Sequence, residues 1–408
     1  MSEAQSLMLQ EAGQSPEVVA TLLQKEKPVF DEIARLFSKN PPGVVTTAAR
    51  GSSDHAATFF KYLFEITCGV PVASIGPSIA SVYGASLHLK GGIHFTVSQS
   101  GASPDIVALQ DAAKRGGATT IAVVNVTDSP LAKQADIVLG LNAGDEKSVA
   151  ATKSFIASVA ALSGVTAAIG AKADLWTALD KLPEALQATS GIDTAAAEDV
   201  LFDATSLYTG GRGPAFAIAL EAALKAKETS GLHAEAFSLA ELMHGPMRLV
   251  QPGFPIVAFA PDDAAYTNNI QALERLQKLG ATTVPFSTQP LSGINLRVPT
   301  TGNGLLDPLG QQRTIGKLGQ GVMARHERDL GFGPSLLGHI IIGDEPAAIR
   351  RRSLVDRNDP SIAEMLEIAA ALVMRQESFV LREQFRYRLV AMISGGNAQM
   401  QDSLESRA

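Results

Sequence analysis

Residues 93–105 read IHFTVSQSGASPD, and this stretch decides the fold. Its first five residues, Ile93 to Val97, are apolar or β-branched for the most part, a pattern typical of a buried strand. The polar loop SQSGASPD at 98–105 follows and opens a helical stretch. The sequence therefore predicts a strand, a turn and a helix in direct succession, which is the repeating step of a parallel sheet covered by helices.

The same step recurs on both sides of this stretch. Short β-branched runs alternate with longer amphipathic or alanine-rich runs, and they predict five strands in a first unit. The expected strands are 44–48, 70–75, 93–97, 120–126 and 137–141, and the expected helices include 56–66, 104–115 and 149–168.

A second unit repeats the pattern after a connecting stretch at 173–199. The turn glycines Gly51 and Gly211 precede the loops at Ser98 and Pro261 by 47 and 50 residues, as in a diverged domain-scale repeat. We therefore expect an α/β protein with two tandem units, each a five-stranded parallel sheet with helices on both faces. In the second unit the expected strands are 206–209, 254–259 and 282–286, and the expected helices are 215–230 and 270–279.

Length and composition exclude several classes of protein. The chain has 408 residues with 46% hydrophobic residues, enough for two or three folded domains. Its 34 basic and 41 acidic residues give a net charge of −7, which provides no basic surface for nucleic acid or an anionic membrane. The single cysteine, Cys68, and the absence of a signal-peptide pattern favour a cytoplasmic location. The histidines show no metal-ligand spacing, so we expect neither a metal nor a cofactor.

Two loops in the first unit carry hydroxyl groups. The loop at 98–105 holds three serines and a glutamine, and the first strand ends in Gly51-Ser52-Ser53-Asp54. Backbone N–H groups and the helix dipole favour an anion at such strand–helix junctions, and hydroxyls can add hydrogen bonds to a phosphate monoester. The alternative is that these residues only cap helices. The matching loops of the second unit, at 210–213 and 260–263, lack the hydroxyls, so we expect phosphate binding in the first unit alone.

A predicted helix in the second unit carries a candidate acid–base group. Glu221, Lys225 and Glu228 are spaced i, i+4 and i+7, so they share one helical face. Together with His244 of the following segment, they could move protons at neutral pH beside a phosphate-binding cleft. The alternative is an exposed stripe of ion pairs, which usually stabilises little.

These motifs together resemble the sugar isomerase (SIS) family. The similarity is to the isomerase half of glucosamine-6-phosphate synthases and to free-standing relatives, and it covers about residues 1–309. It implies two SIS domains of flavodoxin-like topology in a homodimer, with each active site completed by the partner chain. The matching stretches are GSSDHAA at 51–57, SQSGASPD at 98–105, EKSVAATKSF at 146–155, ALEAALKAKETSGLHAEAF at 219–237 and ELMHGP at 241–246.

The resemblance also implies a role for individual residues. Glu228 would be the base that shuttles a proton between C1 and C2 of a sugar phosphate, and Lys225 would assist it. His244, reaching across the dimer interface, would open the sugar ring. The residues implied to bind the phosphate are Ser53, Ser98, Gln99, Ser100 and Ser103, and those implied to lie beside the sugar are Gly51, Ser52, Glu146 and Val149.

The chain departs from the synthases at its beginning. Residue 2 is Ser rather than a nucleophilic cysteine, and no glutaminase domain precedes the SIS pair. The sequence therefore favours the catabolic relatives, which convert glucosamine 6-phosphate to fructose 6-phosphate and ammonia. The alternatives are a galactosamine or tagatose 6-phosphate isomerase or deaminase, and a non-catalytic regulator that binds a sugar phosphate.

The composition changes at Gly310. The chain holds 14 Lys and 7 Arg before this residue but 1 Lys and 12 Arg from it onward. This part does not align with the family, whose usual tail lysine we expect to be missing, and we interpret it as a divergent or frame-shifted extension. We therefore expect an N-terminal helical segment at 1–30, SIS domains at 31–185 and 186–309, and an atypical extension at 310–408, with a helix at 360–388.

Overall fold

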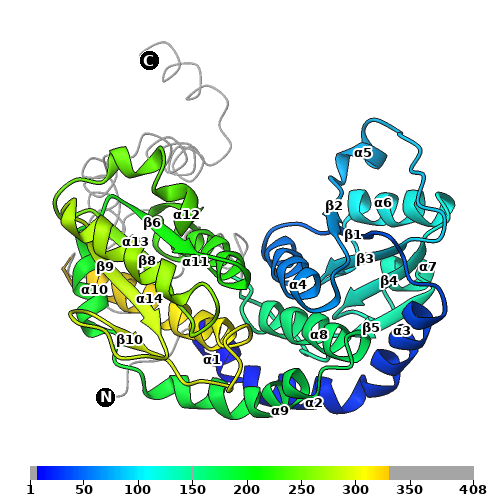
Figure 1. Cartoon of the computed structure of the whole chain (residues 1–408), viewed down its shortest axis with the longest axis horizontal. Helices are drawn as coiled ribbons and strands as arrows, with labels where there is room; N and C mark the ends of the chain where they lie inside the picture. Colours follow the sequence, from blue (N-terminus) through cyan, green and yellow to red (C-terminus); the bar gives the residue numbers. More distant parts are fainter. Residues whose placement is uncertain (1–6, 149, 330–408) are drawn as a thin grey trace, which may run out of the picture. The chain divides into compact units, whose positions relative to one another are not determined.

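Two parallel five-stranded sheets organise the computed structural model, which describes residues 7–148 and 150–329 (Figure 1). The strand orders are β2-β1-β3-β4-β5 and β10-β9-β8-β6-β7, and helices cover the sheets. The expected fold class is confirmed. The strands are β1 Val45–Ala48, β2 Val72–Ser74, β3 Ile93–Ser98, β4 Thr119–Val124, β5 Ile137–Gly140, β6 Ser206–Gly211, β7 His233–Ser238, β8 Pro255–Phe259, β9 Thr282–Ser287 and β10 Leu296–Arg297.

Helices form most of the remaining described chain. Most of the helices expected from the sequence lie within one to four residues of their observed bounds, and the helix at 104–115 matches both bounds. The helices are α1 Leu7–Gly13, α2 Ser15–Lys25, α3 Lys27–Lys39, α4 Ser52–Cys68, α5 Ser78–Ser81, α6 Pro104–Arg115, α7 Pro130–Gln134, α8 Lys153–Ile169, α9 Ala173–Ala188, α10 Ala195–Phe202, α11 Pro214–Ser230, α12 Leu239–Leu242, α13 Tyr266–Lys278 and α14 Pro308–Asp329, with short 3-10 turns at Thr189–Gly191 and Pro246–Leu249.

Two strands of the second sheet are not located by the sequence pattern. Strand β7 reads HAEAFS and pairs with β6 alone, so it is an edge strand whose exposed positions carry polar side chains. Strand β10 has two residues and pairs only with β9. Neither segment provides the continuous apolar run that reveals a strand buried on both faces.

Helices α4 and α11 pack against each other and join the two sheets (Figure 1). Their contact is part of a hydrophobic core that includes Ala56 and Phe59 of α4 and Ala215, Ala219 and Ala222 of α11. Because alanine side chains are short, the two helices can approach closely. This packing places the start of α4 beside the middle of α11, where the candidate acid–base residues lie.

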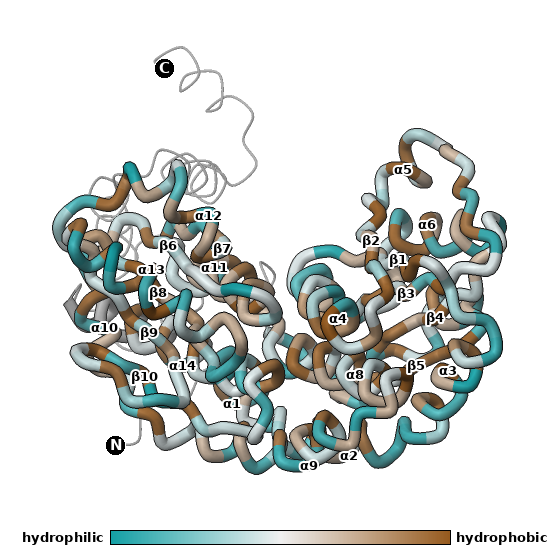
Figure 2. The backbone as a smooth tube through the Cα atoms, viewed as in Figure 1, coloured by the Kyte–Doolittle hydropathy of each residue, from teal (hydrophilic) through white to brown (hydrophobic). Residues whose placement is uncertain are grey.

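Helix α8 is buried almost all round, and after Lys153 its sequence carries no charge. Figure 2 shows hydrophobic, brown stretches along its tube. It packs against α2, α3, α4 and α9. No helix among the described residues has the length and apolar character needed to cross a bilayer.

The two sheets are equivalent in topology, and glycines mark the equivalent turns. Gly51 before α4 has φ 54° and ψ −134°, and Gly213 before α11 has φ 60° and ψ −137°. A positive φ is readily adopted only by glycine, so both positions require this residue. The turn equivalent to Gly51 is therefore at Gly213. The expected equivalence of Gly51 with Gly211 is wrong, because Gly211 is the last residue of β6.

Helix α14 contains the point at which the composition changes. It packs on α11 and α10, yet its buried face includes Gln311 and Gln312, which are 0% and 1% exposed. Neither amide atom of Gln311 has a hydrogen-bond partner in the described part of the chain. A buried amide without partners is unfavourable, so this face of the helix is poorly matched to its core. Residues 330–408, with the expected helix at 360–388, lie outside the described residues, and the expected domain boundaries stay predictions.

His94 makes the fold sensitive to acid. It lies fully buried in β3, and its Nδ1 is 2.8 Å from Thr46 Oγ. Burial lowers the pKa of the imidazole from 6.5 to about 4. Between these two values the unfolded chain binds more protons than the folded chain, so stability falls as the pH falls. We expect the free energy of unfolding to drop by about 3 kcal/mol from this group between pH 6.5 and pH 4.

Urea unfolding measured across this pH range checks the expectation. The His94→Gln variant should show a shallower loss of stability on acidification than the parent. The control His88→Gln, at an exposed position, should follow the parent curve. Equal acid limbs in all three proteins would contradict the assignment to His94.

Candidate active site

The serine-rich loop follows β3 at the edge where β1 and β3 end side by side. These strands pair in parallel, with Ala48 opposite Thr96, so the loops after both strands lie at one edge of the sheet. The chain leaves β1 toward β2 on one side and returns to β3 on the other, which makes this a topological switch point. Open α/β sheets bind ligands at such points.

Local hydrogen bonds shape the loop at 98–103. The hydroxyl of Ser98 accepts a bond of 3.0 Å from the Gly101 N–H, and that of Ser100 accepts one of 3.4 Å from the Ala102 N–H. Gly101 has φ 60°, and a Cβ there would lie 2.1 Å from Ser129 Oγ. Glycine is therefore required for both the turn and the close approach of Ser129.

An ion pair joins the loop after β1 to the start of α6, which follows the serine-rich loop. The Arg50 guanidinium forms an ion pair with Asp105 in the first turn of α6. Ser53 in α4 and Ser103 before α6 are half-buried, and their hydroxyls have no hydrogen-bond partner within the described residues. Gln99, like Ser53, is half-buried. The hydroxyls of Ser53 and Ser103 are therefore available to a ligand, and the expected phosphate binding at the switch point stays a prediction.

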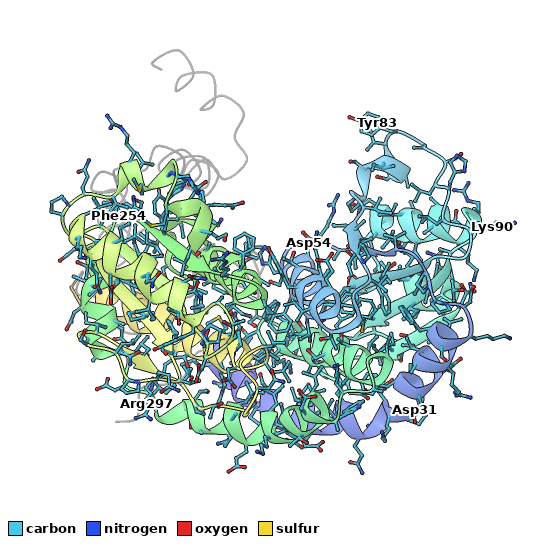
Figure 3. All side chains as sticks on the ribbon, viewed as in Figure 1. Asp31, Asp54, Tyr83, Lys90, Phe254 and Arg297 are labelled. Atoms are coloured by element: carbon cyan, nitrogen blue, oxygen red, sulfur yellow. The ribbon has the colours of Figure 1, made fainter. Side chains whose placement is uncertain are left out.

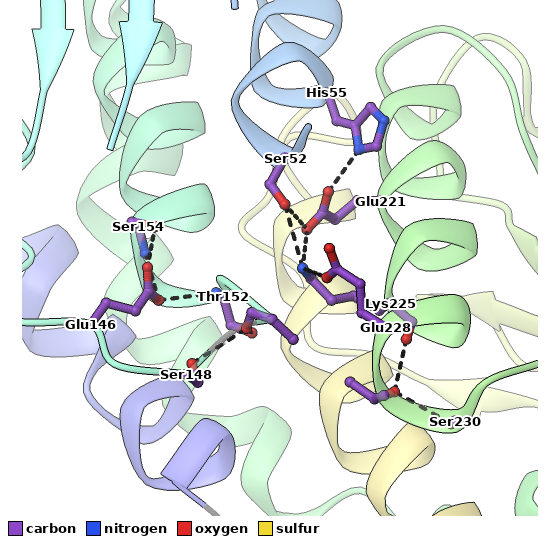
Figure 4. Close-up of polar contacts among 12 residues, drawn as sticks. Ser52, His55, Glu146, Ser148, Thr152, Ser154, Glu221, Lys225, Glu228 and Ser230 are labelled. Carbon is purple, nitrogen blue, oxygen red and sulfur yellow. Dashed lines mark hydrogen bonds and ion pairs between the residues drawn. The ribbon is translucent and has the colours of Figure 1, made fainter. Parts of the chain in front are cut away.

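Ser52 and His55, at the start of α4, contact the helix of the second domain. The Ser52 hydroxyl donates to Glu221 Oε1 at 2.9 Å, and His55 Nδ1 lies 2.7 Å from Glu221 Oε2 (Figure 4). The sequence predicts that Ser52 lies beside the sugar. The structure adds a second role, because the Ser52 hydroxyl holds the buried Glu221 carboxylate.

Lys225 lies between two carboxylates on the predicted face of α11. Its Nζ is 3.2 Å from Glu221 Oε1 and 2.8 Å from Glu228 Oε2 (Figure 4). The Glu221 and Lys225 side chains are 0% and 3% exposed, whereas the Glu228 side chain is 29% exposed. The exposed-stripe alternative is therefore wrong for this cluster: two of its three members are buried.

Opposite charges decide the ionisation of this cluster. Burial alone would raise the pKa of the Glu221 carboxyl, but Lys225, His55 and Ser52 outweigh burial and hold the pKa below its usual value. Burial alone would lower the pKa of the Lys225 ammonium, but Glu221 and Glu228 outweigh it and raise the pKa. Both groups are therefore charged at neutral pH.

The segment before α8 is held by two acids, the half-buried Glu146 and the buried Glu11. Glu146 Oε1 accepts bonds from the N–H groups of Thr152 and Lys153, at 3.0 and 2.9 Å. Glu11 of α1 accepts bonds from the N–H groups of Lys147 and Ser148, at 2.7 and 3.1 Å. The Glu146 side chain thus caps the start of α8, and its expected place beside the sugar stays a prediction. Val149 lies outside the described residues.

No hydrogen bond or ion pair joins His244 to the cluster around Lys225 among the described residues. This histidine is exposed in the turn after α12, and its ring forms no hydrogen bond within the described residues. Its expected action across a dimer interface stays a prediction.

Two residues of the site are missed by the sequence reasoning. The sequence predicts no role for His55, which lacks metal-ligand spacing, and none for Glu11. The sequence signals for His55 are its place in the stretch GSSDHAA at 51–57 and its position one helical turn after the Gly51–Ser52 start of α4. Neither spacing nor composition indicates that Glu11 would reach the segment before α8.

Fold and site together define a class of protein. The chain combines two parallel sheets of the same topology with a hydroxyl-rich loop at a switch point and a buried Glu–Lys pair beside a more open Glu, which is the architecture of an α/β domain pair with a small-molecule site. The SIS domain sequence profile matches residues 44–168 and 200–296, and the chain therefore belongs to the SIS domain family.

Relatives and solved structures agree with this assignment. The glutamine–fructose-6-phosphate aminotransferase (isomerizing) of Methanothermobacter thermautotrophicus is 33% identical over 279 residues, covering 67% of this chain and 46% of that protein. The chain thus spans about half the length of the curated relatives it matches.

Two structures extend the comparison. A protein of Silicibacter pomeroyi, provisionally named a phosphosugar isomerase, has a TM-score of 0.75 and 38% identity, covering 81% of this chain and 100% of that one. The C-terminal domain of glucosamine-fructose-6-phosphate aminotransferase from Francisella tularensis has a TM-score of 0.71 and 25% identity, covering 78% and 96%.

Proposed function

We propose that the protein is an isomerising amino-sugar phosphate deaminase, which converts glucosamine 6-phosphate and water to fructose 6-phosphate and ammonia. The observation that carries the proposal is the unequal exposure of the two acids around Lys225. The Glu228 side chain is 29% exposed and the Glu221 side chain is 0% exposed. Only Glu228 can therefore reach a substrate, and Glu221 serves to position Lys225.

The reaction requires one proton to move between neighbouring carbons. After His244 of a second copy opens the ring, Glu228 removes the proton from C2 and returns it at C1. A proton passes from the 2-amine to O1, so that the C1 aldehyde becomes a hydroxymethyl group and the 2-amine becomes an imine. Water then hydrolyses the imine and releases ammonia. Lys225, whose ammonium is fixed by Glu221, stabilises the negative charge that develops on the substrate oxygen.

The phosphate is bound at the switch point of the first domain. Ser53, Ser98, Ser100 and Ser103 supply hydroxyls there, and Gln99 adds an amide. Ser52, which contacts both Glu221 and Lys225, connects this loop region to the acid–base group. The same binding mode includes the expectation from the sequence that Gly51, Glu146 and Val149 lie beside the sugar.

An ammonia-release assay across amino-sugar 6-phosphates tests the function. We expect release from glucosamine 6-phosphate, with formation of an equal amount of fructose 6-phosphate. Release from galactosamine 6-phosphate alone would move the assignment to the other epimer, which one hydrogen bond can select. Tight binding of every sugar phosphate without turnover would reject the enzyme and favour a regulator.

A further inference from the structure

The second domain contains a cleft that the proposed reaction does not use. Its volume is about 370 Å³, and it lies beside α12 and α13. This volume is within the range of small-molecule sites. The polar residues that line it are Arg212, Asn268, Asn269, Gln271 and Arg275.

The cleft lies beside α13, the helix that corresponds to α6 after the serine-rich loop of the first domain. Strands β6 and β8 are adjacent and parallel, as β1 and β3 are, and α13 follows β8 as α6 follows β3. Arg212-Gly213 corresponds to Arg50-Gly51, because the two glycines share their unusual backbone angles. Arg212 of the cleft therefore follows the carboxyl end of β6, beside the switch point of the second sheet, where a ligand is expected.

The two equivalent arginines differ in their partners. Arg50 is neutralised by Asp105 in the first turn of α6. The first turn of α13 contains no acidic residue, and no carboxylate among residues 7–148 and 150–329 lies within 4.0 Å of Arg212 or Arg275. The cleft thus has two exposed guanidinium groups available to an anion.

Asn269 gives a second, independent indication of a ligand. It lines the cleft at 1% exposure, and neither its Oδ1 nor its Nδ2 has a hydrogen-bond partner in the described chain. An unpaired buried amide is unfavourable unless a ligand or ordered water satisfies it.

The acids of the preceding loop are otherwise engaged. Asp262 Oδ2 accepts a bond of 2.8 Å from the Gln289 amide, and Asp263 Oδ1 accepts one of 2.8 Å from the Ala265 N–H. Neither acid lines the cleft. The charge of Arg212 still acts on the Asp263 carboxyl, whose pKa is raised mainly by burial. Neither acid pairs with an arginine of the cleft within 4.0 Å.

We propose that this cleft is a second anion site, which binds a phosphate monoester or inorganic phosphate through Arg212, Arg275 and Asn269. This proposal departs from the expectation that only the first domain binds phosphate. That expectation rests on the loops of the second domain, which lack the hydroxyls of the first. In the cleft, guanidinium groups take the place of those hydroxyls. The proposal does not depend on the proposed reaction, because turnover plays no part in its test.

Calorimetric titration of the full chain with inorganic phosphate tests the proposal. The first-domain site is weakened beforehand by Ser100→Ala and Ser103→Ala, so that the remaining binding reports on the cleft. Adding Arg212→Gln and Arg275→Gln should weaken phosphate binding by at least about tenfold. The matched control Arg297→Gln removes the same charge from β10, at the opposite edge of the sheet (Figure 3), and should leave the affinity unchanged.

Asn269→Leu separates a ligand-binding role from a structural one. Because the substitution removes an unpaired buried amide, the variant should fold and melt at or above the temperature of the parent. Phosphate should raise its melting temperature less than it raises that of the parent. Equal phosphate binding by the parent, the double arginine variant and Asn269→Leu would overturn the proposal, as would binding no stronger than that of chloride at equal ionic strength.

Discussion

Glu228→Gln is expected to lower ammonia release from glucosamine 6-phosphate by about a thousandfold, because a general base contributes on the order of 10²–10⁴ to such a step. The amide has the size of the acid and can still contact Lys225, so its main effect is on proton transfer. The affinity for fructose 6-phosphate should change little, since the phosphate is proposed to bind at the other end of the site.

The measurement is kcat and product affinity, with solvent deuterium incorporation into the product as a direct probe of proton transfer. The control Glu274→Gln removes an exposed acid from α13 of the same domain and should retain full activity. Full activity of Glu228→Gln would reject the proposed mechanism. A loss of activity accompanied by an equal loss of product binding would assign Glu228 to binding instead.

The sequence predicts those parts of the site that lie within one element. The spacing of Glu221, Lys225 and Glu228 on one helix is fixed by helical geometry, so their common face can be predicted from residue numbers alone. The serine-rich loop is likewise a local feature, placed by the strand before it and the helix after it.

The sequence does not reveal contacts between distant elements. The bond between His55 and Glu221 joins residues 166 positions apart, and it exists because the alanines of α11 allow α4 to approach. The same packing buries Lys225. The i, i+4 spacing alone is equally compatible with an exposed position for this residue. The hydropathy pattern does not reveal β7, because an edge strand with exposed polar positions lacks a continuous apolar run.

Glu221 stabilises the fold and balances the charge of the buried Lys225 ammonium. Substitutions at Glu221 and Lys225 distinguish these two roles. In Glu221→Leu the Lys225 ammonium remains buried with Glu228 as its single acidic partner, and His55 and Ser52 lose their acceptor. Breaking a buried ion pair on one side lowers the free energy of unfolding by about 3–5 kcal/mol. We expect a loss of this size in urea unfolding at neutral pH.

The double variant Glu221→Leu with Lys225→Met supplies the matched control. It replaces the buried pair by apolar side chains of similar volume, and such replacements are often neutral for stability, so most of the lost free energy should return. Catalytic activity should not return, because Lys225 is absent. The effect of Glu221→Leu should also shrink on acidification: the pKa of the Glu221 carboxyl is held below its usual value, and the stabilisation it provides is lost as the pH falls through that pKa. Equal stabilities of the single and double variants would show that the charge of Lys225 is not what makes Glu221 necessary.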